Sequence, residues 1–313
     1  MLKLFLAGLA ISMATLTVGC SGPAPSQAAE TSLEGAILNP STGDRLSFED
    51  VLEEARAARF VMLGEKHDNP AHHRMQARIL EGIAADGRKP AVVWEMIPFS
   101  KEAVLAAYLS GDSATPAGLG AALNWDASGW PDWVFYQPIA KVAMDAGLKQ
   151  YAGNIDSAYV RSVAREGFSG LPDPTSRTLA SKARWTENDE TALNADLVDS
   201  HCGFMPDGML GPMNSVQRGR DAVMAASLLE ADVGDGAVLI AGNGHVRADR
   251  GVPRYLEPER NVLSIGLIEA VDGETDPMAY LEAVDQFDIV IFTSRVETPD
   301  RCAELEKRFG KQN

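Results

Sequence analysis

Four acidic and histidine side chains stand just after short apolar runs, and their types suit metal or acid–base chemistry. Glu65 and His67 follow one run, Glu95 follows a second, and His245 follows a third. If these runs are parallel strands, their carboxyl ends meet at one edge of a sheet and the four side chains share one crevice. We therefore predict Glu65, His67, Glu95 and His245 as ligands of a divalent metal. If the protein is a hydrolase, Glu65 and Glu95 are its predicted acid and base.

A second group of side chains suits an apolar or anionic ligand. His201, Met205 and Met209 lie in a connection rich in glycine, proline and methionine, which suits a porphyrin face or a hydrophobic peptide. Such a loop is equally typical of one that plugs the core. Arg220 grips an anionic ligand or a site carboxylate in one interpretation and faces solvent in the other. Tyr136, Tyr151 and Tyr159 are candidate phenolate ligands, and their spacing does not select one of them.

The elements that must position these side chains alternate along the chain. Apolar runs of strand length alternate with amphipathic helical stretches, which predicts an α/β fold with a largely parallel central sheet and helices on both faces. The expected strands are 60–63, 91–94, 150–152, 238–241, 262–265 and 289–292. The expected helices are 48–58, 70–86, 101–110, 139–146, 157–166, 187–200 and 215–232, the longest of them forming a helical insertion.

Local signals refine this outline. Ser47 and Asp50 form a capping box for the first helix. His72 and His73 lie one turn into the next helix, so we expect one of them to face the crevice and the other to face away. Residues 116–138 mix tryptophans with glycine and proline, which predicts an irregular aromatic layer or lid.

The N-terminus has the features of an export signal. Residues 1–19 carry Lys3 and then an apolar run too short to span a membrane, and Cys20 follows a glycine, as in bacterial lipoproteins. We predict a lipoprotein signal peptide over 1–19, lipidation at Cys20, a flexible tether over 20–33 and a single domain over 34–313. Ser21 favours the outer membrane, facing the periplasm. An ordinary secretory signal cut further on is the alternative.

Charge and cysteine content narrow the partners. With 28 Lys plus Arg against 44 Asp plus Glu, the formal net charge is −16, which argues against nucleic acid and against electrostatic attachment to anionic lipid. Membrane attachment would therefore come from the lipid on Cys20. The two remaining cysteines, Cys202 and Cys302, could form one disulfide in an oxidising compartment.

Five short motifs stand in order along most of the chain: VMLGEKHDN at 61–69, VWEM at 93–96, HCG at 201–203, QRGRDAVMA at 217–225 and GNGHVR at 242–247. In order and content they resemble the ChaN-type haem-binding lipoproteins of the Tiki superfamily. The resemblance implies an α/β outer-membrane lipoprotein for haem or iron uptake, a homodimer that encloses haem, and an outer-membrane haem receptor as partner. The wider superfamily includes metal-dependent proteases and esterase-like hydrolases with two Gly-x-x-His motifs, both present here.

Three hypotheses follow. The first is a haem- or iron-binding uptake lipoprotein without turnover, with His201, Met205, Met209, Arg220 and Tyr136 as haem-binding residues. The second is a metal-dependent hydrolase, whose activity Glu65→Ala would abolish. The third is a non-catalytic interaction module of the cell envelope.

Overall fold

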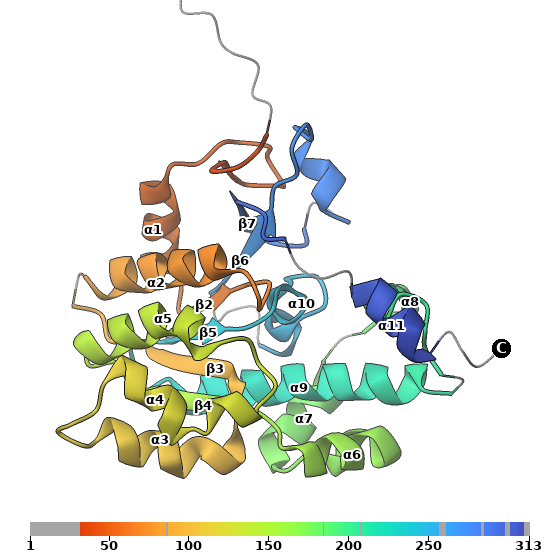
Figure 1. Ribbon diagram of the computed structural model, residues 1–313, viewed down its shortest axis with the longest axis horizontal. Helices are drawn as coiled ribbons and strands as arrows, with labels where there is room; N and C mark the ends of the chain where they lie inside the picture. The colour runs from red at the N-terminus through yellow and green to blue at the C-terminus, as the bar shows by residue number, and fades with distance from the viewer. Residues whose placement is uncertain are drawn as a thin grey trace, which may run out of the picture. The chain divides into compact units, whose positions relative to one another are not determined.

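Seven strands form one sheet in the described part of the chain (Figure 1). The structure is a computed structural model, and it describes residues 32–85, 87–183, 185–206, 208–256, 261–282, 285–297 and 301–309. Across the sheet the strands are β1 (Ile37–Leu38), β7 (Ile289–Thr293), β6 (Val262–Glu269), β2 (Phe60–Leu63), β5 (Ala237–Ile240), β3 (Ala91–Pro98) and β4 (Gln150–Asn154). Neighbouring strands are parallel except β1, which is antiparallel to β7. The predicted α/β class is confirmed.

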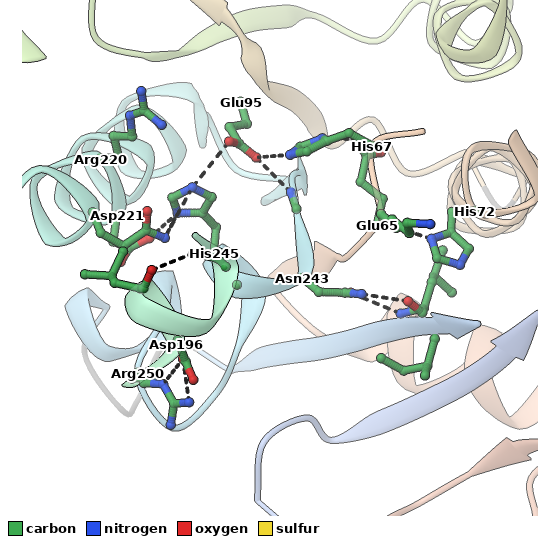
Figure 2. A pocket seen from close by; sticks show the side chains of 18 of the residues that line it. Glu65, His67, His72, Glu95, Asp196, Arg220, Asp221, Asn243, His245 and Arg250 are labelled. Atoms are coloured by element: carbon green, nitrogen blue, oxygen red, sulfur yellow. Dashed lines mark hydrogen bonds and ion pairs between the residues drawn. The ribbon is translucent and has the colours of Figure 1, made fainter. Parts of the chain in front are cut away.

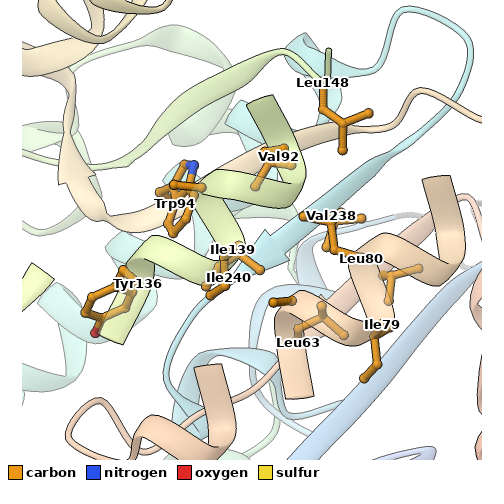
Figure 3. Close-up of a cluster of buried hydrophobic side chains, with 14 of the residues drawn as sticks. Leu63, Ile79, Leu80, Val92, Trp94, Tyr136, Ile139, Leu148, Val238 and Ile240 are labelled. Atoms are coloured by element: carbon orange, nitrogen blue, oxygen red, sulfur yellow. The ribbon is translucent and has the colours of Figure 1, made fainter. Parts of the chain in front are cut away.

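The strands are apolar along their whole length because both faces of the sheet are covered. Successive side chains of a strand point to opposite faces, so Val61 and Leu63 enter one apolar layer while Phe60 and Met62 enter the other. Figure 3 shows part of the first layer, in which Leu63 lies near Ile240. The sheet is therefore a buried platform whose strand ends are held by two cores.

Helices cover both faces. The helices of the first layer are α1 (Phe48–Ala57), α2 (Pro70–Ala84), α3 (Glu102–Leu109), α4 (Pro116–Ala122) and α5 (Trp133–Asp145). Those that pack in the second layer are α6 (Ser157–Glu166), α7 (Pro174–Lys182) and α9 (Leu210–Ala231). The remaining ones are α8 (Glu187–Ser200), α10 (Asn243–Val246) and α11 (Arg301–Phe309). Helices α6 to α9 lie between β4 and β5 in the chain and form the predicted helical insertion.

Capping residues fix several helix starts. The predicted capping box of α1 is confirmed, because Ser47 Oγ accepts from the Asp50 amide at 3.2 Å and Asp50 Oδ2 accepts from the Ser47 amide at 2.7 Å. The start of α9 was predicted too late, at residue 215, whereas the helix begins at Leu210. Pro212 is tolerated there because the first turn of a helix leaves its N–H groups without helical partners.

The prediction of an irregular layer at 116–138 was wrong in part. Thr115 caps α4 and Asp132 caps α5, so much of the segment is helical. The aromatic packing was predicted correctly, since the rings of Trp125 and Trp133 lie 4.7 Å apart and those of Trp125 and Tyr136 lie 5.1 Å apart. The helix starts were missed because the caps compete with the turn signals of glycine and proline.

Cys202 and Cys302 form a disulfide with a Cα–Cα distance of 5.5 Å, a pairing that the sequence alone left open. It connects the turn after α8 to α11, across a sequence separation of 100 residues. Among the described residues, no helix is long and apolar enough to cross a membrane. The predicted signal peptide, Cys20 and nearly all of the tether lie outside the described residues.

Candidate functional site

A cavity of about 690 Å³ lies beyond the carboxyl ends of the central strands (Figure 2). Its floor is formed by Glu65, His67, Glu95 and His245, the four side chains predicted to meet there. Helices α8 and α9 contribute walls, and the last residues of β6 contribute a third. The sheet thus gathers segments that are far apart in sequence, as the parallel arrangement requires.

Glu65 is buried and anchors one half of the floor. Its Oε1 accepts from His67 Nδ1 at 2.7 Å and from the Tyr136 hydroxyl at 3.0 Å, while His73 Nε2 lies 3.2 Å from Oε2. Burial alone would raise the pKa of Glu65, but its contacts with His67 and His73 outweigh burial and hold that pKa well below its usual range. Glu65 is therefore an anion that orients the His67 ring.

Glu95 anchors the other half. Its Oε2 accepts from the Gly242 amide at 2.7 Å, and its Oε1 lies 3.3 Å from His245 Nε2. His245 Nδ1 in turn donates to Asp221 Oδ1 at 2.6 Å. Burial opposes the charge of His245, yet the flanking Glu95 and Asp221 raise its pKa to about 10. Burial opposes the charge of Glu95 too, but His245 and the other contacts lower its pKa to about 2.

His67 joins the two halves of the floor. Its Nε2 lies 3.8 Å from Glu95 Oε2, and its ring centroid lies 4.7 Å from that of Trp130. Burial would lower the pKa of His67, but the hydrogen bond to Glu65 and the charge of Glu95 raise it. The result is a row in which carboxylates and imidazoles alternate, with a partly exposed His67 ring at its centre.

Glycine is required at two strand ends because the backbone passes close to other groups. A Cβ on Gly242 would lie 2.9 Å from His67 Nε2, and one on Gly64 would lie 2.2 Å from Asn243 Oδ1. Neither glycine has a positive φ. Close approach, rather than a sharp turn, explains both residues.

His72 lines the cavity and His73 does not, as predicted, but both histidines contact residues of the site. His72 Nδ1 accepts the Lys66 amide at 2.8 Å, and His73 contacts Glu65. Burial lowers the pKa of His72 to about 4, so this ring is neutral at pH 7. Both side chains are fully buried because α2 packs directly on the strand end.

The floor does not have the geometry of a preformed metal centre. Within the described residues, no group of three or more His, Cys, Asp or Glu side chains is arranged to hold a metal ion. The predicted ligands Glu65, His67, Glu95 and His245 are instead engaged with one another in pairs.

The predicted haem-binding residues are dispersed. Tyr136 is fully buried with its hydroxyl on Glu65, and this burial raises its pKa. Arg220 lines the cavity, whereas His201, Met205 and Met209 lie after α8 and outside the cavity lining. Met209 is exposed. Their roles in binding haem remain predictions.

Asp221 is a site residue that the sequence interpretation did not single out. It is 1% exposed and pairs with His245. Burial raises its pKa to about 6, although His245 opposes this. A signal was present: Gln217 and Asp221 are four residues apart, so they share a helix face, and both line the cavity.

The fold and the cavity define an open-sheet α/β protein whose site lies beyond the carboxyl ends of its strands. Residues 51–256 match the family model described as "Haem-binding uptake, Tiki superfamily, ChaN". The chain belongs to this family. The match spans the strand ends after β2, β3 and β5 and the helices that form the cavity walls.

The chain is also similar to solved structures. A structure described as cofacial haem binding to ChaN of Campylobacter jejuni superposes with a TM-score of 0.65 at 22% identity, covering 82% of this chain and 95% of that one. The type III effector HopBA1 has a TM-score of 0.42 at 15% identity, covering 82% of this chain and 94% of its own. No curated protein matches the chain. At 22% identity the likeness to the ChaN structure concerns the fold alone.

Proposed function

We propose that this protein binds haem at the cell envelope and takes part in haem or iron uptake, and that His201 would hold the haem iron. Membership of the haem-binding uptake family supports the ligand class. The orientation of the His201 ring is the observation that carries the proposal. Bound haem would supply an iron centre that is carried rather than turned over.

His201 is held as an iron-binding histidine needs to be. Its Nδ1 lies 2.7 Å from the Leu197 carbonyl oxygen and 3.1 Å from Ser200 Oγ. Because a carbonyl only accepts, Nδ1 carries the proton in the neutral ring and the lone pair is on Nε2. Such a hydrogen bond fixes the tautomer and orientation of a metal-binding imidazole.

The exposure of the histidine side chains narrows the choice of the iron-binding residue. The sequence has five, and His72, His73 and His245 are each at most 6% exposed. His67 and His201 are the two whose rings are partly exposed. His67 also donates from Nδ1 to a carboxylate, so it is the second candidate for an axial ligand. Two histidines, His201 and His67, are therefore candidates to hold the haem iron.

The residues that follow His201 and those that line the main cavity also support haem as the ligand. Met205 and Met209 follow His201 and offer polarisable apolar contacts for a porphyrin face. Leu193, Leu197 and Ile268 line the neighbouring cavity, and its charged lining includes Arg220, which suits a propionate. Tyr136 would act indirectly, by holding Glu65 and so His67.

The location is also part of the proposal. Lipid on Cys20 would attach the protein to the outer membrane, facing the periplasm, where haem arrives from an outer-membrane receptor. A homodimer that encloses haem would place a planar ligand between two copies. The Cys202–Cys302 disulfide supports an oxidising compartment.

A haem titration of the soluble form that begins at Ser21, read by absorbance, tests the proposal. We expect saturation at a defined stoichiometry, and a loss of affinity of about tenfold or more in His201→Ala, since an axial bond is lost. Met278→Ala, at an exposed methionine elsewhere, is the control and should bind as wild type. No saturable change would refute haem binding, and an unaltered His201→Ala spectrum would move the ligand to His67.

A second candidate function is hydrolysis by acid–base chemistry, and the alternating row of the cavity floor favours it. His67 lies between Glu65 and Glu95 with its ring partly exposed and its pKa raised, as a proton-transfer group requires. Hydrolysis of p-nitrophenyl esters would fall about 100-fold or more in His67→Ala and in Glu95→Gln. Equal rates in these variants and in wild type would exclude a catalytic floor.

A further inference from the structure

A second cavity of about 350 Å³ adjoins the main one and shares Trp130 and Arg220 with it. Its other walls come from the ends of β3 and β4 and from the segment between α4 and α5. Because two wall residues belong to both cavities, a ligand group bound here would lie beside one bound above the acid–imidazole floor.

Arg220 has no carboxylate partner among the described residues. No hydrogen bond or ion pair is formed by its guanidinium in that part of the chain, and its Nε is buried without a hydrogen-bond partner (Figure 2). The adjacent Asp221 is hydrogen-bonded to His245, and it interacts with Arg220 only electrostatically, without a hydrogen bond. In a chain with net charge −16, a partly buried and unpaired guanidinium is unusual.

A second cation lines the same cavity. Lys101 faces it, and no ion pair joins Lys101 to any described residue. The one carboxylate in the lining is Asp156, whose oxygens accept hydrogen bonds from the Ser100 amide and hydroxyl. Two cations against one anion leave an excess of one positive charge, which matches a monoanion better than a phosphate dianion.

Apolar and aromatic side chains form part of the remaining lining, among them Trp125, Trp130 and Met96, so the site combines flat apolar contact with a cationic end. Polar side chains complete the lining: Asn124, Ser128, Asn154 and Ser157. An arginine guanidinium binds a carboxylate with two parallel hydrogen bonds, which gives this group geometric selectivity.

We propose that this second cavity is a carboxylate-binding subsite for the acid group of an aromatic ligand, with Arg220 and Lys101 as the anion-binding residues and Trp130 as the wall shared with the main cavity. The proposal of this subsite does not depend on haem binding, because the charge and shape of the cavity suit any planar carboxylate of suitable size.

The matched probes 1-naphthoate and 1-naphthamide test it, since they differ in charge and share one shape. Calorimetric titration of the soluble form should give naphthoate about tenfold tighter binding than naphthamide. Arg220→Gln should remove this preference, and Lys101→Gln should reduce it. Arg161→Gln makes the same charge change at an exposed position of α6, and should leave the preference intact.

Equal affinity for the two probes, or a preference that survives in both Arg220→Gln and Lys101→Gln, would overturn the subsite. Circular dichroism of each variant shows that the fold is retained. Haem does not enter this experiment, so a failure of haem binding and a failure of the subsite are read separately.

Discussion

The floor and the α8 wall of the main cavity are held in place by different forces. The floor residues Glu65, Glu95 and His245 stand at the ends of buried strands and are each at most 6% exposed. Of the described side chains of α8, only Leu193 and Leu197 are as buried as those of the core. Packing of the two apolar layers thus defines the floor, whereas α8 depends on individual links.

Those links are polar or covalent. Arg250 contacts Asp196 at 2.6 Å, and Arg218 contacts Glu190 at 2.9 Å. The Cys202–Cys302 disulfide follows the last turn of α8, directly after His201. The position of the floor therefore depends on the packing of the core, whereas α8, at whose end the proposed haem ligand His201 lies, responds to salt, charge and redox state.

The largest effect is expected from breaking the disulfide. Cys302→Ser removes a cross-link across a separation of 100 residues and should lower the free energy of unfolding by about 3–5 kcal/mol. Urea unfolding with and without reductant measures it, and reductant should then have no further effect on the variant. If reductant leaves the unfolding midpoint of the wild type unchanged, the cross-link contributes nothing to stability.

A buried floor pair should matter more than a pair on the wall. Glu95→Gln leaves a buried His245 without one of its anions and should cost about 3 kcal/mol. Glu190→Gln removes the half-exposed partner of Arg218 and should cost less than about 1 kcal/mol. Equal costs in denaturant unfolding would remove the distinction between floor and wall.

The pH dependence of stability should report the floor alone. Because the pKa of His245 is raised to about 10, the folded state holds its proton more tightly than the unfolded state. This stabilisation is fully present below pH 6.5 and is lost progressively as pH rises through about 10. Unfolding at pH 6.5 and 9.5 measures it, and Asp221→Asn should flatten the slope.

The smallest expected effect on stability comes from adding one methyl group at Gly242. Gly242→Ala would place a Cβ 2.9 Å from His67 Nε2 and should cost about 1–2 kcal/mol while displacing that ring. Gly244→Ala is the control, since its Cβ would meet only Gln217 Nε2 at 3.9 Å. If both variants unfold at the wild-type midpoint, the close approach at Gly242 has no energetic weight.

Much of the fold could be predicted because it follows from local patterns. Fully apolar runs bounded by turns indicate buried parallel strands, and the Ser47–Asp50 capping box indicates the start of α1. The meeting of Glu65, His67, Glu95 and His245 also followed, because parallel strands end at one edge. Helix starts at Trp133 and Leu210 were missed, since proline and glycine mask the first turn.

The sequence by itself determined the α/β class, the gathering of the floor residues and the family motifs, because periodicity and order along the chain carry that information. Only the tertiary structure decided that Asp221 pairs with His245, that His72 and His73 are both buried, and that Arg220 is left without a partner between two cavities. These facts depend on which side chains from distant elements come within a few ångströms of one another. No pattern within a single element specifies such distances.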